Sequence, residues 1–249
     1  MLNLVYPEIP SYSFPDWEKL SMIPIQENNE PLEPVSLANK LKMYPAYYKL
    51  RVANALPECF VRSSVLDRLN LAATFLPGHL YLVVLDGWRP FSVQQYLFDS
   101  LTNLLTKSLP DLPLEKVRAK ARTLVSPPSD NPETPSPHLT GGSVDVTLCD
   151  QNGRFLNMGT LFDEASDDSW TAALENKTSP DKSTQVAIQN RRMLFHAMTQ
   201  AGFTNLPSEW WHYDFGNQLW AINKGERHAL YGVTSITSIE QGWKEQLAR

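Results

Sequence analysis

The sequence predicts an α+β fold, in which helices pack on a mainly antiparallel sheet. Three segments have apolar residues at helical spacing, namely residues 63–76, 92–105 and 183–200. Two short runs of strand-forming residues, 80–85 and 143–148, lie between these segments. A mixture of long helices and short buried strands is typical of this fold class.

The N-terminal part of the chain, residues 1–45, is rich in Pro, Glu and Asn and shows little periodicity. We expect it to be an extended arm that packs on the rest of the protein. The 249 residues are enough for one large domain. We therefore predict a single domain over residues 1–249 that includes this arm.

The first predicted helix is closed by Pro77-Gly78, and Gly87 and Pro90 break the strand that follows it. A second helix is predicted from about residue 92, and a third over 113–123, with proline in its first turn. Five prolines between residues 126 and 137 then predict a stiff, irregular loop. In the strand at 143–148, Asp145 falls on the polar face of what we expect to be a half-buried strand.

The acidic, polar segment 163–183 is predicted to be a surface loop. The helix after it is expected to begin at Ser183 or Thr184 and to end before Gly202. Two further short strands are predicted at 219–223 and 228–233, around a turn at Lys224-Gly225.

The composition excludes several classes of partner. Hydrophobic residues make up 42% of the chain and aromatic residues 10%, which is ample for a core. The net charge of −5, with no block of Lys or Arg, argues against nucleic acid and anionic membranes. No signal peptide or membrane span is recognised, so we expect a cytoplasmic protein. Cys59 and Cys149 lack metal-site spacing and are expected to be free, buried thiols.

Four residues in two short strings predict a zinc site. His138 and Asp145 are seven residues apart, with Gly141-Gly142 between them, so a loop and a strand can present both to one point. With His212 they would form a set of two imidazoles and one carboxylate, which binds zinc and leaves one position to water. Taken alone, each could also be a turn histidine, a solvated strand aspartate or a core histidine.

Glu209 is the candidate base that takes the proton of this water. It precedes His212 by three residues, so in a flat strand the two side chains would point to opposite faces. They converge only if Glu209 lies in the turn after Pro207, or if the segment makes a helical turn. Arg89, in the string Asp-Gly-Trp-Arg-Pro, could hold an oxyanion or could form a structural pair with Asp86.

Taken together, these strings resemble the zinc D-alanyl-D-alanine dipeptidases of the vancomycin-resistance type. This family belongs to a group of zinc D,D-peptidases that share a fold with the hedgehog signalling domain. The resemblance covers roughly residues 60–215. The matching stretches occur in the family's order, and they are Asp86–Pro90, Ser136–Leu148, Met158–Asp163, Asn190–Arg192 and Glu209–Tyr213.

The resemblance implies a single zinc peptidase domain that cleaves D-alanyl-D-alanine or a related D,D-dipeptide, a small peptide of cell-wall chemistry. It implies Zn²⁺ as the cofactor, bound by His138, Asp145 and His212. It implies Glu209 as the general base and Arg89 as the residue that stabilises the oxyanion. It also implies contacts of Asp163 with the substrate's ammonium group and of Ser136 with its carboxylate.

The N-terminal third departs from the family pattern, since the usual Tyr-rich segment with Asn-Asn-Phe is replaced by other residues, among them 43–48. Alternatives are therefore a D,D- or L,D-carboxypeptidase acting on longer cell-wall peptides, or amidase or ester chemistry on another substrate. A non-catalytic zinc-binding module is a further alternative. The presence of Glu209 and Arg89 argues against it, because a binding module needs neither residue.

Overall fold

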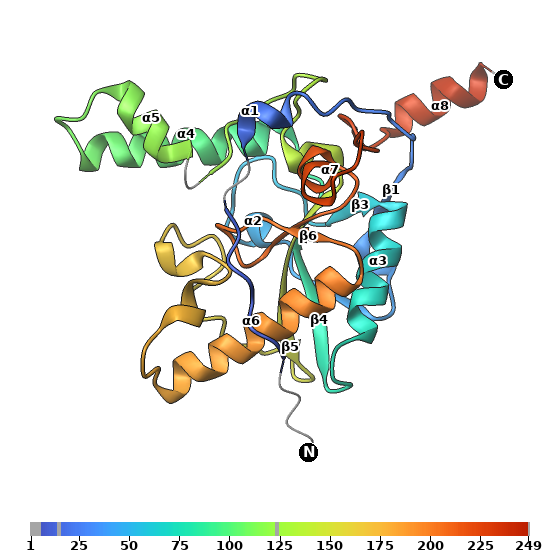
Figure 1. The fold of residues 1–249 in the computed structure, drawn as a ribbon. Helices are drawn as coiled ribbons and strands as arrows, with labels where there is room; N and C mark the ends of the chain where they lie inside the picture. Colours follow the sequence, from blue (N-terminus) through green and yellow to red (C-terminus); the bar gives the residue numbers. More distant parts are fainter. Residues whose placement is uncertain (1–5, 14–15, 123–124, 249) are drawn as a thin grey trace.

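A five-stranded mixed sheet forms the centre of the protein (Figure 1). The computed structural model describes residues 6–13, 16–122 and 125–248. The strand order is β2-β4-β5-β7-β6, and only the β2–β4 pair is parallel. The strands are β2 (Leu41–Met43), β4 (Leu80–Asp86), β5 (Ser143–Asp150), β6 (Thr204–Asn205) and β7 (His212–Asp214). The predicted α+β class with a mainly antiparallel sheet is thus confirmed.

Helices α3 (Ser63–Thr74) and α6 (Lys182–Gln200) pack against each other and contact the sheet. The main hydrophobic core lies where these helices pack on the sheet. The sheet residues in it are Leu82 and Val84 of β4 and Val144, Val146 and Leu148 of β5. Both helices were predicted. However, α6 begins at Lys182, because the Asp181 side chain accepts a hydrogen bond from the Thr184 N–H and so caps the first turn earlier than expected.

The other face of the sheet is also covered, so the prediction of a half-buried strand around Asp145 was wrong. Residues 143–149 of β5 are all buried. A second, smaller cluster packs on this face and joins Val83, Leu85 and Cys149 to Ala46 of the short helix α2 (Ala46–Lys49). Asp145 therefore lies in the interior, where a charged group must have partners.

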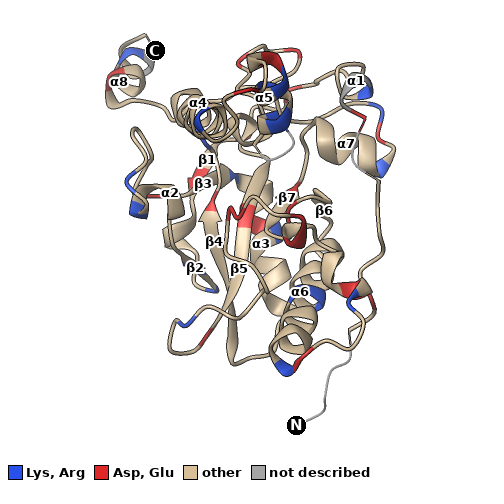
Figure 2. Cartoon of the chain, turned by 90° about the vertical axis from the view of Figure 1, so that its left-hand side faces the viewer, with Lys and Arg blue, Asp and Glu red and all other residues tan. Residues whose placement is uncertain are grey.

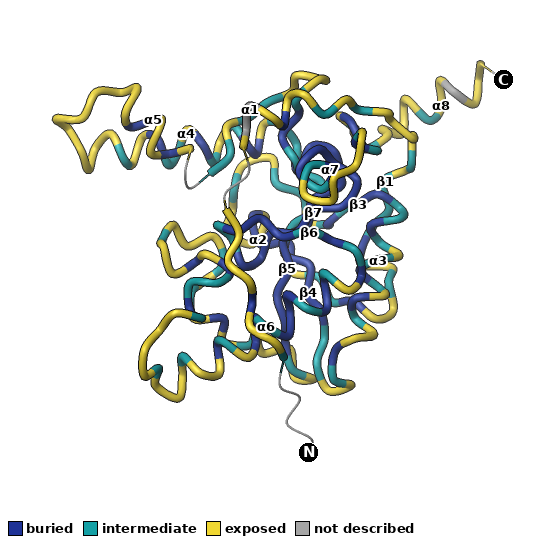
Figure 3. The backbone as a smooth tube through the Cα atoms, viewed as in Figure 1, coloured by how far each residue is buried: buried dark blue, intermediate teal, exposed yellow. Residues whose placement is uncertain are grey.

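Two helical parts project from this body (Figures 1 and 3). Helices α4 (Phe91–Ser108) and α5 (Leu114–Arg122) form a hairpin, in the region where two helices were predicted. Residue 123, the predicted end of the second of these, lies outside the described residues. Helix α8 (Ile239–Leu247) projects elsewhere, and Figure 3 shows both projections as largely exposed.

The N-terminal segment contributes strands in addition to an arm. Helix α1 (Trp17–Leu20) is short, β1 (Leu32–Pro34) pairs with β3 (Phe60–Arg62), and β2 forms one edge of the main sheet. The expectation of an extended arm over 1–45 was therefore incomplete. Strands of three residues are too short to show a readable periodicity and form only because the body offers them a partner. Residues 1–5 and 14–15 of this segment lie outside the described chain.

The two predicted C-terminal strands are absent from the described residues. Residues 218–224 form helix α7 (Gln218–Lys224), which Asn217 caps by accepting from the Trp220 N–H and which Gly225 closes at φ +71°. Asn217 and Gly225 mark the start and the end of a short helix, so the predicted strand at 219–223 with a turn at Lys224-Gly225 was wrong. Residues 228–233 are irregular, with one bridge between Ala229 and Ile25.

The acidic segment 163–183 is mostly exposed, as predicted, and contains two short 3₁₀ helices, η3 (Asp167–Ser169) and η4 (Ala173–Asn176). Cys59 and Cys149 are free and buried, as expected. Within the described chain, none of the helices combines the length and the apolar character needed to cross a membrane.

Candidate metal centre

The proline-rich loop leads into a short 3₁₀ helix, η2 (Pro137–Thr140), which carries His138 onto the sheet. Gly141 follows in the left-handed conformation, at φ +71°. A side chain there would be strained, and its first carbon would lie 2.6 Å from Leu32. This tight reversal returns the chain directly into β5, so His138 stays close to Asp145.

Strand register brings the remaining groups to the same place. In the antiparallel β5–β7 pair, Asp145 lies directly opposite His212. In the β4–β5 pair the register shifts between Val84 and Asp86, so that Asp86 comes opposite Asp145. Without this bulge Asp86 would follow the alternation of Val84 onto the core face. Asp86 is the last residue of β4 and Asp145 the third of β5. Figure 2 shows acidic segments among the strands of the sheet.

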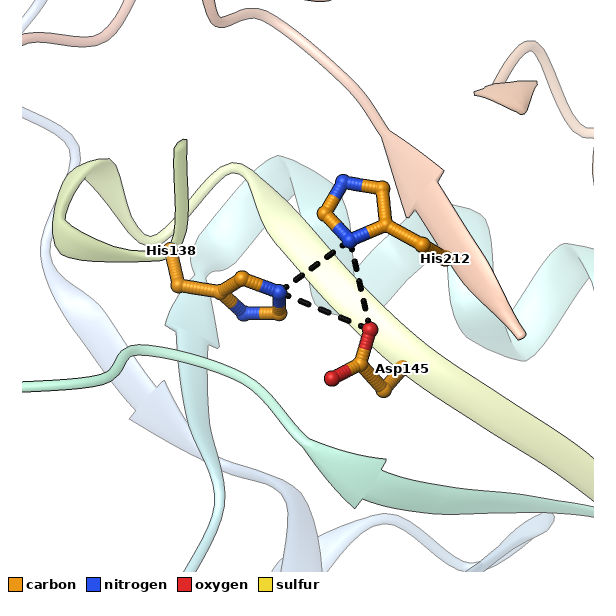
Figure 4. A group of neighbouring side chains, drawn as sticks. All are labelled: His138, Asp145 and His212. Atoms are coloured by element: carbon orange, nitrogen blue, oxygen red, sulfur yellow. Dashed lines mark hydrogen bonds and ion pairs between the residues drawn. The ribbon is translucent and has the colours of Figure 1, made fainter. Parts of the chain in front are cut away.

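His138, Asp145 and His212 converge on one point (Figure 4). One ligand atom from each side chain lies within 4.8 Å of the other two. Asp145 Oδ1 is 3.4 Å from His138 Nε2 and 3.3 Å from His212 Nδ1, and these two nitrogens are 3.2 Å apart. All three residues are buried. The structure thus brings together the three residues that the sequence suggested as ligands.

In each imidazole, the hydrogen bond of the nitrogen that faces away from Asp145 determines whether the nitrogen that faces Asp145 carries a proton or a lone pair. His138 Nδ1 is 2.8 Å from the Gly87 carbonyl, and His212 Nε2 is 3.1 Å from Asp214 Oδ1. Both far nitrogens face acceptors, so in the neutral imidazoles these nitrogens carry the protons and the two near nitrogens present lone pairs. Asp145 Oδ1 is buried without a hydrogen-bond partner. Three buried acceptors facing one another fit a cation, and this donor set suits Zn²⁺.

The charge of Asp145 is held by its surroundings. Burial opposes its ionisation, but the positive charge that His138 and His212 carry when protonated, together with that of Arg89, outweighs burial and keeps the pKa of this carboxyl well below its usual value. A bound cation would supply this positive charge in place of the two imidazole protons. Arg89 Nη2 donates to Asp145 Oδ2 at 3.0 Å, which leaves Oδ1 for the centre. The aspartate is therefore a carboxylate, the form in which it can bind a metal.

Glu209 lies in the turn before β7, which is the condition under which the sequence predicted convergence with His212. Its N–H donates to the Leu206 carbonyl at 3.0 Å, and its own carbonyl accepts from the His212 N–H at 3.3 Å. Glu209 Oε2 comes within 3.8 Å of His212 Nδ1, and the side chain is 21% exposed. Burial is the main cause that raises the pKa of Glu209 to about 7.

Arg89 lines the same cavity as the three buried ligands and Glu209. Its Nε donates to Asp86 Oδ2 at 2.7 Å and its Nη1 to Gln94 Oε1 at 2.7 Å. The structural pair with Asp86, which the sequence suggested as an alternative, is thus present. The pair holds the guanidinium at the cavity rather than away from it, and the role of Arg89 toward an oxyanion stays a prediction.

The two candidate substrate-binding residues differ in position. Asp163 lines the cavity; although the residue as a whole is exposed, its carboxyl is surrounded by protein, and this burial raises its pKa to about 6. Ser136 is not among the residues that line the cavity. Its hydroxyl accepts from the Ser129 N–H at 2.8 Å and lies 3.4 Å from the Pro127 carbonyl, within the proline-rich loop.

Three residues of the site were missed in the sequence. Asp214 orients His212, Gln94 holds Arg89, and Tyr47 lines the cavity beneath the Arg89 guanidinium. Asp214 could have been noticed, because it alternates with His212 on one strand and so shares its face. Tyr47 and Gln94 carry no such signal, since only the folded chain brings them to Arg89.

Comparison with solved structures gives weak likenesses. VanYB in complex with D-alanine-D-alanine aligns with 70% of this chain and 81% of its own, at 16% identity and a TM-score of 0.41. The D,D-dipeptidase VanXYg in complex with a D-Ala-D-Ala phosphinate analogue aligns with 84% and 69%, at 17% identity and a TM-score of 0.38.

Sequence similarity is much stronger. A D-alanyl-D-alanine dipeptidase of Synechocystis sp. is 32% identical over 222 residues, which are 83% of this chain and 90% of the relative. A D-alanyl-D-alanine dipeptidase of Enterococcus faecium is 30% identical over 156 residues, 60% of this chain and 68% of the relative. The Peptidase_M15 family model, described as D-ala-D-ala dipeptidase, matches residues 51–229. The chain therefore belongs to the D-Ala-D-Ala dipeptidase family and is a metallopeptidase.

Proposed function

We propose that this peptidase hydrolyses D-alanyl-D-alanine or a closely related D,D-dipeptide, with a zinc ion bound by His138, Asp145 and His212. The observation that carries the proposal is the set of three buried acceptors that face one another without a donor, with Asp145 Oδ1 unpartnered. The names of the relatives support the substrate class. We take residues 1–249 as one catalytic domain.

Zinc bound there would polarise the scissile carbonyl and lower the pKa of a water molecule. Glu209 would accept the proton of the attacking water and return it to the leaving amine. Its position within 3.8 Å of His212 supports this role, because a general base must lie within hydrogen-bond reach of the reacting water. Its raised pKa suits a group that takes up and releases a proton near neutral pH.

Arg89 would stabilise the negative charge that develops on the carbonyl oxygen. A guanidinium has five N–H groups, and four acceptors are found for Arg89 among the described residues. One N–H on Nη1 therefore remains for a substrate oxygen. Asp86, Gln94 and Asp145 hold the group in place before substrate arrives, which is the arrangement that makes such stabilisation effective.

Asp163 would bind the ammonium group of a free dipeptide, since its carboxyl lines the cavity beside Glu209. The contact of Ser136 with the substrate carboxylate stays a prediction, because its hydroxyl would first have to leave its partners in the loop. A charged partner for the ammonium would explain a preference for free dipeptides over longer chains.

One observation favours a second candidate, a carboxypeptidase that acts on longer cell-wall peptides. A neighbouring cavity shares Asp163 and Glu209 with the first and continues between α4 and the loop that carries Ser166. Leu97 and Leu101 lie on its α4 side. A peptide extended on the amine side could enter this cavity, so blocked substrates must be tested beside free ones.

The experiment measures release of D-alanine from D-Ala-D-Ala by the zinc-loaded protein, with N-acetyl-D-Ala-D-Ala as second substrate. Glu209→Gln keeps the size of the side chain and removes the base. We expect kcat to fall by roughly 10²–10⁴-fold in this variant, the range for loss of a general base. Glu226→Gln, at an exposed position, is the matched control and should behave as the wild type.

Cleavage of the free dipeptide alone supports the dipeptidase, and cleavage of the acetylated dipeptide alone supports the carboxypeptidase. A protein that binds zinc stoichiometrically and cleaves neither substrate would rule out both. Full activity of Glu209→Gln would exclude Glu209 as the base, whichever substrate is used.

A further inference from the structure

Tyr47 is a buried tyrosine that lines the cavity of the proposed catalytic residues. It lies on α2, before the family match that begins at residue 51. It is only 5% exposed and lines the cavity together with Arg89, Asp163 and Glu209. The neighbouring Tyr48, in contrast, is 47% exposed.

The ring of Tyr47 supports the guanidinium of Arg89 from one face. Arg89 Cζ is 4.7 Å from the ring centroid, a cation–π distance. Three other partners, Asp86, Gln94 and Asp145, hold the guanidinium by its N–H groups. A planar cation that is bonded along its edges and stacked on one face has little freedom to tilt.

The hydroxyl of Tyr47 lies between Arg89 and Asp163 in the proposed interaction network. It accepts from Arg89 Nη2 at 3.4 Å, so its own O–H is left to donate. Asp163 lines the same cavity and offers an acceptor, and interaction with the Tyr47 hydroxyl opposes the burial that raises the pKa of this carboxyl. The same hydroxyl thus bonds to the residue proposed for the carbonyl oxygen and faces the cavity that also holds the residue proposed for the ammonium.

Aromatic packing keeps this hydroxyl in position. The Tyr47 ring lies 5.6 Å from that of Phe162, the residue before Asp163, and the Phe162 ring lies 5.5 Å from that of Trp211. Trp211 immediately precedes His212. The row of three rings therefore connects α2 to both the Asp163 loop and the strand that carries His212.

We propose that Tyr47 is a positioning residue for the dipeptidase, and that it holds Arg89 and Asp163 at a distance matched to a dipeptide with a free amine. The inference rests on the proposed function. In the proposed function Arg89 would bind the carbonyl oxygen and Asp163 the ammonium group of the substrate's first residue. Loss of the Tyr47 hydroxyl should therefore weaken binding of the ammonium group more than binding of the rest of the substrate.

The test is Tyr47→Phe, which keeps the ring and removes the hydroxyl, with Tyr48→Phe as the matched control. The quantities measured on zinc-loaded protein are kcat and KM for D-Ala-D-Ala and the inhibition constant of N-propionyl-D-alanine. This inhibitor has the shape of the dipeptide without its ammonium group. We expect kcat/KM of Tyr47→Phe to fall about tenfold, the effect of a lost hydrogen bond to a charged group. The inhibition constant should stay within about twofold.

A second comparison uses Asp163→Asn as the background. There Tyr47→Phe should have a smaller effect than in the wild type, because one partner of the hydroxyl has already been changed. Zinc content and thermal stability of all variants establish that the fold and the metal centre are intact.

Three results would overturn the inference. The first is a kcat/KM for Tyr47→Phe within twofold of the wild type, measured while the wild type is active. The second is an inhibition constant that rises as much as kcat/KM falls, which would indicate general damage. The third is a wild-type protein that cleaves no dipeptide, and this result alone also overturns the proposed function.

Discussion

His212 is held by a buried network on the side that faces away from Asp145. Asp214 Oδ1 lies 3.1 Å from His212 Nε2 and also accepts from the Ser143 hydroxyl at 2.6 Å and from Asn217 Nδ2 at 2.7 Å. Burial opposes the charge of Asp214, but these partners together lower the pKa of its carboxyl. A fixed carboxylate on Nε2 keeps the lone pair of Nδ1 directed at the proposed metal.

The substitution Asp214→Asn tests this orientation. It keeps the shape of the side chain but removes the charge, so His212 loses its preference for the tautomer that leaves Nδ1 free. We expect the affinity for zinc to fall about 10–100-fold, as is usual for second partners of metal-binding histidines. Competition with a chromogenic chelator measures it. Asp150→Asn, at the far end of β5, is the control, and equal affinities of all three proteins would contradict the prediction.

At the scale of the element, α7 and α8 begin in the same way but differ in packing. Asn217 accepts from the Trp220 N–H at 3.0 Å and Ser238 from the Gln241 N–H at 3.1 Å. The two caps are therefore chemically alike. Helix α7 buries Leu219 and Ala221, whereas α8 projects from the body and exposes its apolar side chains.

We therefore expect Asn217→Ala and Ser238→Ala to differ in their effect on global unfolding. Loss of Asn217 removes a cap and the hydrogen bonds to Ser143 and Asp214, and should lower the free energy of unfolding by about 2–4 kcal/mol. Loss of Ser238 frays a helix that supports little else, and should cost less than about 0.5 kcal/mol. Urea unfolding distinguishes them, and equal losses would show that α8 is packed in solution.

At the scale of the whole molecule, Arg62 connects parts that are far apart in the sequence. Its side chain is 2% exposed and donates to Glu27 in the N-terminal segment, to the carbonyl of Thr140 after the metal-site loop, and to that of Gly232 near the C-terminus. The backbone N–H of Arg62 also donates to Gly141. One buried cation thus holds the arm, the turn after His138 and the C-terminal segment together.

Replacement of Arg62 by alanine should be strongly destabilising. It leaves Glu27 and the carbonyl groups of Glu30, Thr140 and Gly232 without their donor. Removal of one partner of a buried ion pair costs about 3–5 kcal/mol. The control is Lys19→Ala, which removes a cation of the N-terminal segment that is 68% exposed and pairs with Asp16. Its loss should cost at most about 1 kcal/mol. The prediction fails if denaturant unfolding finds the two variants equally stable.

The sequence by itself determined the family and the long elements, and it indicated the candidate metal site. The strings around His138 and Glu209 indicated the metal site, because metal ligands must be particular residue types at spacings a turn can close. The helices α3, α4 and α6 and the strands β4 and β5 were readable because their apolar patterns extend over several turns or form continuous buried runs. Local chemistry and local periodicity are properties of the chain before it folds.

Only the tertiary structure decided which groups meet. The bulge that turns Asp86 toward Asp145, the burial of both faces of β5 and the contact of Tyr47 with Arg89 all depend on pairing between distant segments. The position of Ser136, away from the cavity, depends on the hydrogen bonds of its loop. Strand β2 and helix α7 are too short to show a clear hydrophobic periodicity. Their secondary structure is therefore set by the segments of the molecule that pack against them.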